Sequence, residues 1–408
     1  MRAGAHRADA VPLTFLPYGR QSIGEDDIAA VVDALRADML TTGPRVAAFE
    51  EAFAARIGAP HAVAVANGTA ALHLALLTLD LQPGDVCIVP TLTFLATANA
   101  VRFAGGEVVF ADVDPDTALL TPETARAAIA RAGGRRVRAI LPVHYAGPMA
   151  DLSGLRAVAG EVGAVLIEDS CHALGSRDAR GQAAGACIET AMACFSFHPV
   201  KTIACGEGGM IATRDAAIAA RLARLRSHGM ERNLDAFAQP VLGCDVDGGP
   251  APWAYEMPAL GFNYRLTDIQ SALGLSQLAK LDLFLDRRAA LVARYQARLT
   301  SLSPHVSALE AAPGQRPGWH LMVARIDFAA LGVPRRIVME RLKQAGVGTQ
   351  VHYVPVHRQT YYRDRYGALD LPGAEHFYAR CLSLPLFPDM DAHDVDRVVD
   401  ALAAAITA

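Results

Sequence analysis

From about residue 61, short apolar runs alternate with longer stretches whose apolar residues recur at helical spacing. The runs HAVAVAN, DVCIVP, EVVFADV and VRAILPV are each followed by such a stretch, and AVLIED is a fifth run. This alternation predicts βαβ units on a largely parallel sheet. Unbroken hydrophobicity in VCIVP, AILPV and AVLIE indicates strands that are covered on both faces.

Two further runs, AMACFSF and GMIATR, are separated by a short segment and predict a hairpin or an antiparallel edge of the sheet. Residues 231–260 have no sustained period and collect Gly, Pro and Asp, which predicts a loop or flap. Residues 265–299 carry apolar positions at helical spacing, which predicts two helices or one kinked helix leading into a second domain.

These patterns predict three parts of the chain. An N-terminal arm covers residues 1–24, and a large α/β domain covers residues 25–275. Residues 276–408 mix strand and helix patterns and are expected to form a smaller α+β domain.

Composition excludes several classes of function. The 42 acidic and 38 basic residues give a net charge of −4 without any Lys/Arg run, which disfavours nucleic acid as a partner. Seven cysteines without a CxxC pair or zinc-like spacing indicate reduced thiols, no metal site and a cytoplasmic protein. No segment reaches the ~18–20 apolar residues of a membrane span, and the N-terminus lacks the apolar run of a signal peptide.

Lysine is rare in this chain. Only three of the 38 basic residues are lysine, and two of them, Lys280 and Lys343, lie in helical patterns where a solvated or snorkelling side chain is expected. Lys201 instead follows an apolar run in SFHPVKTIACGEGG. An amine held among apolar neighbours has a lowered pKa and attacks carbonyl groups, so Lys201 is a candidate for Schiff-base chemistry.

Two other polar clusters follow predicted strands. Asn67, Gly68 and Thr69 begin a predicted helix, where backbone N–H groups and a hydroxyl suit a phosphate, although a simple helix cap explains Thr69 equally well. Glu168 and Asp169 end an apolar strand and need a cation or hydrogen-bond donors there, with a structural cap as the alternative.

His172 follows closely after this acidic pair. Taken alone, a histidine of this kind is more often structural than reactive. The Cys171–His172 pair raises the alternative of a thiol nucleophile, but nothing else in the sequence supplies its machinery.

A phosphate site, an acid and a lysine, in that order along the chain, meet the requirements of pyridoxal 5′-phosphate (PLP). The acid keeps the pyridine nitrogen protonated, and the lysine binds the aldehyde. At these residues the sequence resembles the DegT/StrS family of PLP-dependent sugar aminotransferases. The resemblance runs from about Pro17 to Pro388 and includes ANGTAALHLAL, EDSCHALGS, SFHPVKTIACGEGG and GFNYRLTDIQSALGLSQL.

The resemblance implies fold type I, the aspartate aminotransferase-like α/β fold, with a large, mixed, mostly parallel sheet domain and a smaller α+β domain. It also implies a homodimer with shared active sites. It assigns the covalent link to PLP to Lys201, the pyridinium partner to Asp169 and a place near the phenolic oxygen to His172. Further residues that it assigns to the cofactor are Phe94, stacked on the ring, Gly68, Thr69 and Ser196 at the phosphate, and Asn263 from the partner subunit. Those that it assigns to the substrate are Tyr18, Arg265, His352 and Tyr353, although a structural role explains the last three as well.

The motifs SFHPVKT, EDSCHALG, PWAYEM and GFNYRLTDIQ resemble the branch of the family that serves pseudaminic acid biosynthesis. They imply transfer of an amino group from L-glutamate to the 4-keto carbon of a UDP-linked 4-keto-6-deoxy-N-acetylhexosamine, with pyridoxamine 5′-phosphate as the intermediate form. The product would be UDP-4-amino-4,6-dideoxy-N-acetyl-β-L-altrosamine. Family members that dehydrate sugars carry histidine in place of the lysine, so Lys201 favours amino transfer.

Two alternatives stay open: a dTDP- or GDP-linked keto sugar as the substrate, and a non-catalytic PLP-binding regulator. The chain departs from the family pattern in an N-terminal extension of about sixteen residues and in a longer loop, VLGCDVDGGPAP. The position of that loop predicts that it covers the sugar site.

Overall fold

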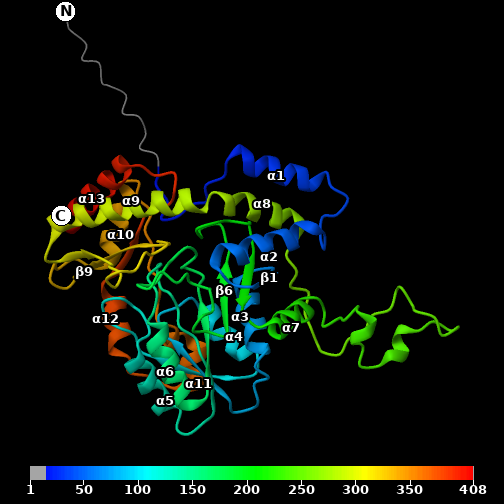
Figure 1. Ribbon diagram of the computed structural model, residues 1–408. Helices are drawn as coiled ribbons and strands as arrows, with labels where there is room; N and C mark the ends of the chain where they lie inside the picture. The colour runs from blue at the N-terminus through cyan, green and yellow to red at the C-terminus, as the bar shows by residue number, and fades with distance from the viewer. Residues whose placement is uncertain (1–14, 408) are drawn as a thin grey trace, which may run out of the picture.

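A seven-stranded sheet forms the centre of the computed structural model, which describes residues 15–407 (Figure 1). Its strand order is β1-β7-β6-β5-β4-β2-β3, and β7 alone runs against the others. The expected N-terminal extension lies almost wholly outside the described residues. The strands are β1 His61–Val65, β2 Val86–Pro90, β3 Glu107–Ala111, β4 Val137–Ile140, β5 Val165–Asp169, β6 Met192–Ser196 and β7 Gly209–Thr213.

The predicted βαβ pattern and the double-sided burial of the strands are confirmed. Along β2, Val86 and Ile88 pack into one hydrophobic cluster while Cys87 and Val89 pack into another on the opposite face. β6 and β7 pair antiparallel in the register Ser196↔Gly209, as the hairpin prediction requires. The alternative of an antiparallel edge is wrong, because β1 pairs with the other side of β7 and is itself the edge strand.

Helices cover both faces of this sheet. α3, α4 and α7 share one face with the C-terminal part of the chain, and the other face carries α2 and α8 at one end and α5 and α6 at the other. The helices are α1 Glu25–Leu35, α2 Pro44–Ile57, α3 Gly68–Leu77, α4 Leu95–Phe103, α5 Pro122–Arg131, α6 Leu152–Val162, α7 Ala216–Arg226 and α8 Asp268–Ala279.

A long helical rod runs along one side of the molecule, from the C-terminal part to α1 and α2 (Figure 1). It consists of α8 and α9, Leu281–Leu299, which meet at Lys280, so the prediction of two helices is confirmed. The solvated alternative for Lys280 is wrong, because its ammonium group binds Asp26 at 2.9 Å and also fully buried Asp27. This ion pair fastens α1 to the rod. Lys343 is exposed, as predicted.

The C-terminal part builds a second, three-stranded antiparallel sheet in the order β10-β9-β8. The N-terminal segment joins this part, since Leu16 pairs with Val347 in an isolated bridge. The boundary between domains at residue 275 stays a prediction. The elements of this part are β8 Val306–Ala308, β9 Met322–Ile326, α10 Arg335–Gln344, α11 Thr360–Tyr366, α12 Pro372–Arg380, β10 Cys381–Leu384 and α13 Ala392–Thr407.

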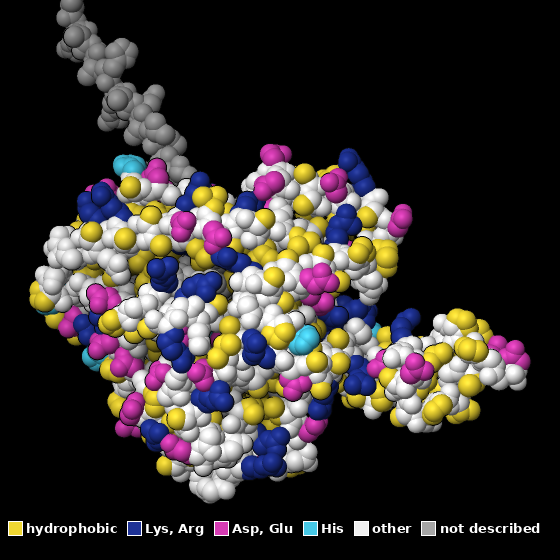
Figure 2. All heavy atoms as spheres, in the orientation of Figure 1, with side chains coloured by type: hydrophobic (Ala, Val, Ile, Leu, Met, Phe, Trp, Pro, Cys, Tyr) yellow, Lys and Arg dark blue, Asp and Glu magenta, His cyan; other side chains and the backbone are white. Residues whose placement is uncertain are grey.

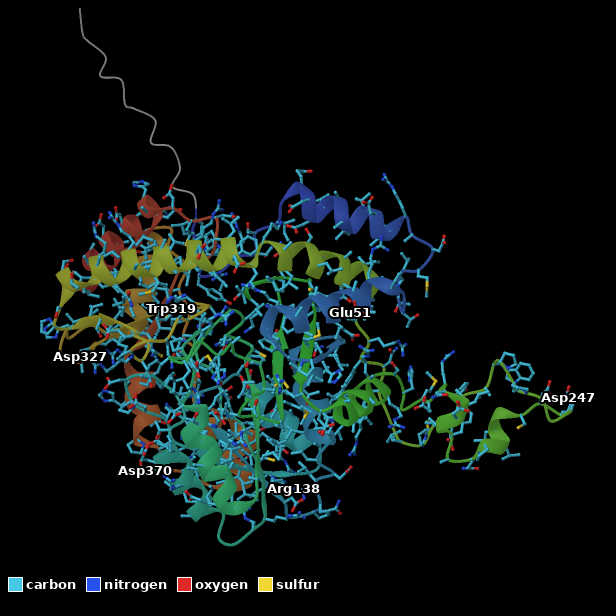
Figure 3. The ribbon with its side chains drawn as sticks, viewed as in Figure 1. Glu51, Arg138, Asp247, Trp319, Asp327 and Asp370 are labelled. Atoms are coloured by element: carbon cyan, nitrogen blue, oxygen red, sulfur yellow. The ribbon has the colours of Figure 1, made fainter. Side chains whose placement is uncertain are left out.

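Residues 231–260 form an arm that projects from the body of the molecule beyond α7, with Asp247 at its tip (Figures 1 and 3). The arm contains two short 3₁₀ turns, Leu234–Ala236 and Pro240–Gly243, and isolated bridges pair Glu231 with Glu256 and Cys244 with Pro250. Hydrophobic side chains are visible on its surface (Figure 2). Among residues 15–407, no helix is long and apolar enough to cross a membrane.

Glu107 links the large sheet to α11 through charge. Its carboxylate binds Arg102 at 2.6 Å and Arg365 at 2.5 Å, and it accepts a hydrogen bond from the Tyr366 hydroxyl at 2.7 Å. The hydrogen bond from Arg365 is the largest of the effects that lower the Glu107 pKa to about 2 from 4.5. The ionised side chain therefore stabilises the fold above about pH 4.5, and this contribution is lost as the pH falls towards 2.

Glu107→Gln should lower the free energy of unfolding at pH 7 by about 1 kcal/mol, the scale of a partly exposed ion pair. Urea titrations at pH 7, 5 and 3 should show this difference shrinking at the lowest pH. Glu340→Gln is the matched control, because its partner Arg336 lies 3.9 Å away and both side chains are more than half exposed. A difference between Glu107→Gln and wild type that grew with acidification would contradict the assignment.

Candidate active site

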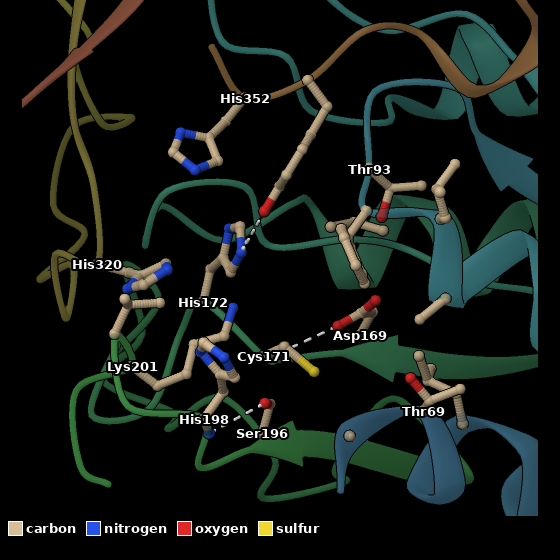
Figure 4. A pocket seen from close by; sticks show the side chains of 18 of the residues that line it. Thr69, Thr93, Asp169, Cys171, His172, Ser196, His198, Lys201, His320 and His352 are labelled. Atoms are coloured by element: carbon tan, nitrogen blue, oxygen red, sulfur yellow. Dashed lines mark hydrogen bonds between the residues drawn. The ribbon is translucent and has the colours of Figure 1, made fainter. Parts of the chain in front are cut away.

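A cavity of about 700 Å³ opens at the carboxyl ends of the parallel strands (Figure 4). This is the edge at which ligands of open α/β sheets bind. Loops after β1, β2, β5 and β6 line the cavity, together with residues 350–354 of the C-terminal part. Of the residues that the sequence singles out, those in the lining are Tyr18, Asn67, Gly68, Thr69, Phe94, Asp169, Cys171, His172, Ser196, Lys201, His352 and Tyr353.

Asp169 ends β5 with a buried side chain that is held by two donors. The Thr97 hydroxyl donates to Oδ2 at 2.7 Å, and the backbone N–H of Cys171 donates to Oδ1 at 3.2 Å. Thr97 is itself paired with the Thr93 hydroxyl at 2.7 Å. These bonds fix the orientation of the carboxylate toward the cavity.

The neighbouring acid, Glu168, is on the opposite side of β5 and has a different environment. It is fully buried and accepts hydrogen bonds from His144 at 3.1 Å and Thr190 at 2.6 Å. Ser170 and the backbone of Gly185 donate to it as well. Because these donors offset the cost of burial, Glu168 is the structural member of the pair, and Asp169 is the one that faces the cavity.

Lys201 faces the same cavity from the loop between β6 and β7. Its side-chain amine has no hydrogen bond to any residue within 15–407, and burial lowers its pKa. Part of that effect is opposed by the negative charge of Asp169. The expectation of a lowered pKa is therefore supported, with burial as the main cause.

His172 is a buried, neutral ring between the backbone and Tyr353. The N–H of Ala146 donates to its Nδ1 at 3.4 Å, and its Nε2 lies 3.1 Å from the Tyr353 hydroxyl. Burial holds the pKa of His172 well below its usual value, and the charge of Lys201 adds to this shift. Burial also raises the pKa of the Cys171 thiol, which counts against a thiol nucleophile.

The start of α3 forms a cradle against the end of β6. Asn67 caps the helix by accepting from the N–H of Ala70 at 2.9 Å, so the first turn keeps its other amide groups free. A Cβ atom at Gly68 would lie 2.8 Å from the Cβ of Ser196. The backbone of Gly68 approaches Ser196 so closely that only glycine fits, and Thr69 lies next to this contact in the cavity wall.

Phe94, Tyr18 and His352 add aromatic rings to the cavity wall. Phe94 is 57% exposed, and its ring centroid lies 5.9 Å from that of Tyr353. The Tyr18 and His352 rings are 5.4 Å apart, and Nδ1 of His352 lies 2.7 Å from the Ser383 hydroxyl. An exposed aromatic face at the mouth of a pocket is suited to stacking on a flat ligand.

Asn263 and Arg265 do not line the cavity of their own chain. The projecting arm does not line it either, so the prediction that this loop covers the sugar site is wrong within one subunit. Its Gly-rich, aperiodic sequence indicated a loop, but periodicity carries no information on the direction in which a loop points. The contribution of Asn263 to a partner subunit stays a prediction.

Sequence reasoning missed several lining or supporting residues. Thr93 and Thr97 lie in a segment whose spacing indicated only the end of a strand and a helix. His320 lies in the wall, with its ring centroid 4.4 Å from that of His172. Its run, HLMVARID, indicated only the start of a strand. The local pattern does not show that this segment, distant in sequence from the other lining residues, lies at the cavity.

Comparison with known proteins identifies this arrangement. Residues 21–403 match the DegT/DnrJ/EryC1/StrS aminotransferase family. The chain belongs to this family. Its members are PLP-dependent transaminases that act on sugars, so the protein is a PLP-dependent sugar aminotransferase of fold type I. Catalysis, rather than the alternative of a non-catalytic regulator, follows from this membership.

Solved structures resemble the fold over nearly its whole length. Helicobacter pylori PseC, an aminotransferase of pseudaminic acid biosynthesis, is 26% identical with a TM-score of 0.86 and covers 96% of this chain and 99% of its own. DesV of S. venezuelae is 34% identical, with a TM-score of 0.81 and coverage of 94% and 95%. The sugar aminotransferase Spr1654 of Streptococcus pneumoniae in its PMP form is 26% identical, with a TM-score of 0.85 and coverage of 96% and 99%.

The residues of the cavity fit PLP. The free amide groups of the first turn of α3 and the Ser196 hydroxyl suit its phosphate, and the oriented carboxylate of Asp169 suits a protonated ring nitrogen. The amine of Lys201 suits its aldehyde, and Phe94 offers an aromatic face.

The cradle supplies a test of the phosphate site. Gly68→Ala should weaken PLP binding about ten- to a hundredfold, because overpacking typically costs ~1–3 kcal/mol and separates α3 from Ser196. Titration of the apoprotein with PLP, followed by absorption, measures the affinity. Gly160→Ala is the matched control, since a Cβ there meets nothing within 4 Å. An unchanged affinity for Gly68→Ala would exclude this cradle as the phosphate site.

Proposed function

We propose that the protein transfers the amino group of L-glutamate to the 4-keto carbon of a UDP-linked 4-keto-6-deoxy-N-acetylhexosamine. The product is UDP-4-amino-4,6-dideoxy-N-acetyl-β-L-altrosamine, an intermediate of pseudaminic acid biosynthesis. The observation that carries the amino-transfer chemistry is the half-buried amine of Lys201 in the same cavity as the hydrogen-bonded carboxylate of Asp169. The likeness to PseC and the motifs around Lys201 and Asp169 support the sugar.

Lys201 moves the proton in both half-reactions. Its lowered pKa leaves a larger fraction of the amine uncharged near neutral pH, and only the uncharged amine can accept a proton from a substrate carbon. In the first half-reaction it takes the proton from the α-carbon of L-glutamate. In the second half-reaction it returns a proton to C4 of the sugar.

Asp169 holds the cofactor ring in its protonated form, with Thr97 and Cys171 fixing the carboxylate from both sides. When bound, PLP supplies an aldehyde carbon that carries the amino group and a protonated ring that withdraws electrons from the reacting carbon. Thr97 is a positioning residue in this proposal, because it touches Asp169 and acts through it.

Tyr353 presents a hydroxyl to the sugar. The Ala146 N–H donates a hydrogen bond to Nδ1 of His172, so Nδ1 carries no proton. The neutral ring therefore has its proton on Nε2, which donates to the Tyr353 oxygen. The hydroxyl proton of Tyr353 is then free to be donated into the cavity. Burial raises the pKa of Tyr353 well above its ordinary value, which keeps this donor protonated.

A second subunit completes the site in this proposal. No arginine lies among the residues that line the cavity in the described chain, yet PLP, L-glutamate and a nucleotide sugar are all anionic. Asn263 and Arg265 lie outside the cavity of their own chain, on one short segment that follows the arm. The arm exposes Val241, Trp253 and Leu260, which a partner subunit would cover.

UDP-, dTDP- and GDP-linked keto sugars are the three classes of candidate substrate. The chain is 26% identical both to PseC and to Spr1654, and 34% identical to DesV. Identity alone therefore does not separate a UDP-linked sugar from a dTDP- or GDP-linked one. Competition among the three classes of keto sugar in one assay separates them.

Lys201→Ala should abolish amino transfer, lowering turnover by about 10³-fold or more, because both proton transfers depend on its amine. PLP should still bind without a covalent link, because the phosphate cradle is intact. Turnover and PLP binding are measured on the same preparation, with Lys343→Ala as a surface-lysine control. Full turnover by Lys201→Ala would exclude the proposed chemistry.

Mixing two variants tests the shared site. Lys201→Ala and Asn263→Ala should each have little activity alone, but in a heterodimer one site carries both native residues. After unfolding and refolding as an equal mixture, about a quarter of wild-type activity should return, since half of the dimers are mixed and each has one intact site. No recovery, with dimers verified by light scattering, would contradict a site shared through Asn263.

A further inference from the structure

His320 is a buried histidine of the cavity wall that the chemistry described above does not use. Its backbone is held on both sides: the N–H donates to the carbonyl of Ala146 at 2.9 Å, and the carbonyl accepts from Arg288 at 3.3 Å. Its ring packs against that of His172 at a centroid distance of 4.4 Å and lines the cavity beside Lys201 (Figure 4). The ring is thus fixed in position before any ligand arrives.

The His320 ring lacks hydrogen-bond partners. The residue is only 4% exposed. Within residues 15–407, neither Nδ1 nor Nε2 of its ring forms a hydrogen bond. The neighbouring cavity histidines differ, since His172 contacts Ala146 and Tyr353 and His352 contacts Ser383. Nδ1 of His320 is fully buried, whereas Nε2 is the nitrogen left open, so a ligand in the cavity reaches the ring through Nε2.

The surroundings keep this ring uncharged. Burial lowers the His320 pKa well below its usual value, and the charges of Lys201 and Arg288 act in the same direction. Arg288 is fully buried and donates to the carbonyls of His320 and Leu386, without a carboxylate partner among the described residues. A neutral imidazole carries its proton on one of its two nitrogens, so Nε2 is either a donor or an acceptor.

We infer that His320 binds the sugar substrate through a hydrogen bond between its Nε2 and one of the hydroxyl or amide groups of the sugar. A hydroxyl or an amide group can donate as well as accept, so it pairs with Nε2 in either tautomer of the ring. The carboxylates of L-glutamate only accept and pair best with cations, which this ring does not supply. His320 therefore contributes to substrate binding in the second half-reaction, with the sugar, and not in the first, with L-glutamate. The inference rests on the proposed function, because it requires a keto sugar as the amino acceptor.

Three variants test this assignment. His320→Phe keeps an aromatic ring against His172 but removes both nitrogens, and His320→Gln keeps one donor and one acceptor. His320→Leu provides a second apolar variant if the aromatic one does not fold. The visible absorption of bound PLP and a thermal unfolding curve identify the variants whose site is formed.

The two half-reactions are measured separately by rapid mixing with L-glutamate and then with the UDP-linked keto sugar, and binding of the amino-sugar product is measured by calorimetry. The apolar variants should bind the product about ten- to a hundredfold more weakly and raise the sugar KM similarly, because a site polar group is lost. The rate with L-glutamate should stay within about twofold. His320→Gln should recover most of the sugar affinity.

His73→Phe is the matched control, because His73 is also a buried histidine with an unpartnered nitrogen but lies outside the cavity. Equal sugar affinity in wild type and the apolar His320 variants would overturn the inference while leaving the proposed function intact. An equal loss in both half-reactions would also overturn it, since that result indicates a structural role. A wild-type protein that reacts with L-glutamate but with no nucleotide-linked keto sugar would overturn the proposed function and this inference together.

Discussion

The parallel pairing of β5 with β6 is the constraint on which the site depends. Asp169 lies beside Cys194 in this register, so the acid that ends β5 is adjacent to the strand that leads to Ser196 and Lys201. Parallel strands end at the same edge of a sheet, and their polar residues meet there without any further folding device. A shift of one residue would turn Asp169 to the other face of the sheet, where Glu168 lies.

The antiparallel strand β7 completes this geometry. Gly209 is paired with Ser196, and a Cβ atom at Gly209 would lie 2.4 Å from the carbonyl oxygen of Asn67. The absence of a side chain lets the end of β1 and the first turn of α3 approach β6. The phosphate cradle, the lysine loop and the acid are therefore set by neighbouring strands of one sheet, which makes the site rigid before a ligand binds.

Local sequence patterns were sufficient for most of the sheet. Five apolar runs marked β1 to β5, and the scarcity of lysine drew attention to Lys201. Glu168 and Asp169 looked equivalent in sequence, and only the side of β5 on which each lies separates the structural acid from the one in the cavity. The period-two geometry of a strand makes neighbours face apart, but the sequence does not tell which face is the site.

What sequence reasoning missed depends on contacts between distant segments. Thr97 reaches Asp169 across 72 positions, and His320 reaches the cavity from a different part of the fold. Lys280 looked like a solvated lysine because its partners, Asp26 and Asp27, lie some 250 positions earlier in the chain. The direction of the arm could not be predicted from local sequence patterns either, because it depends on the orientation of residues 231–260 relative to the rest of the fold.

The central claim is that one cavity carries an amino group from an amino acid to a nucleotide-linked keto sugar. The most direct test follows the visible absorption of the PLP-loaded protein as L-glutamate is added, and then the UDP-linked 4-keto-6-deoxy-N-acetylhexosamine. The account predicts that L-glutamate removes the absorption band of the Lys201-bound cofactor and that the keto sugar restores it. A band that L-glutamate leaves unchanged, or that no nucleotide-linked keto sugar restores, would contradict the account.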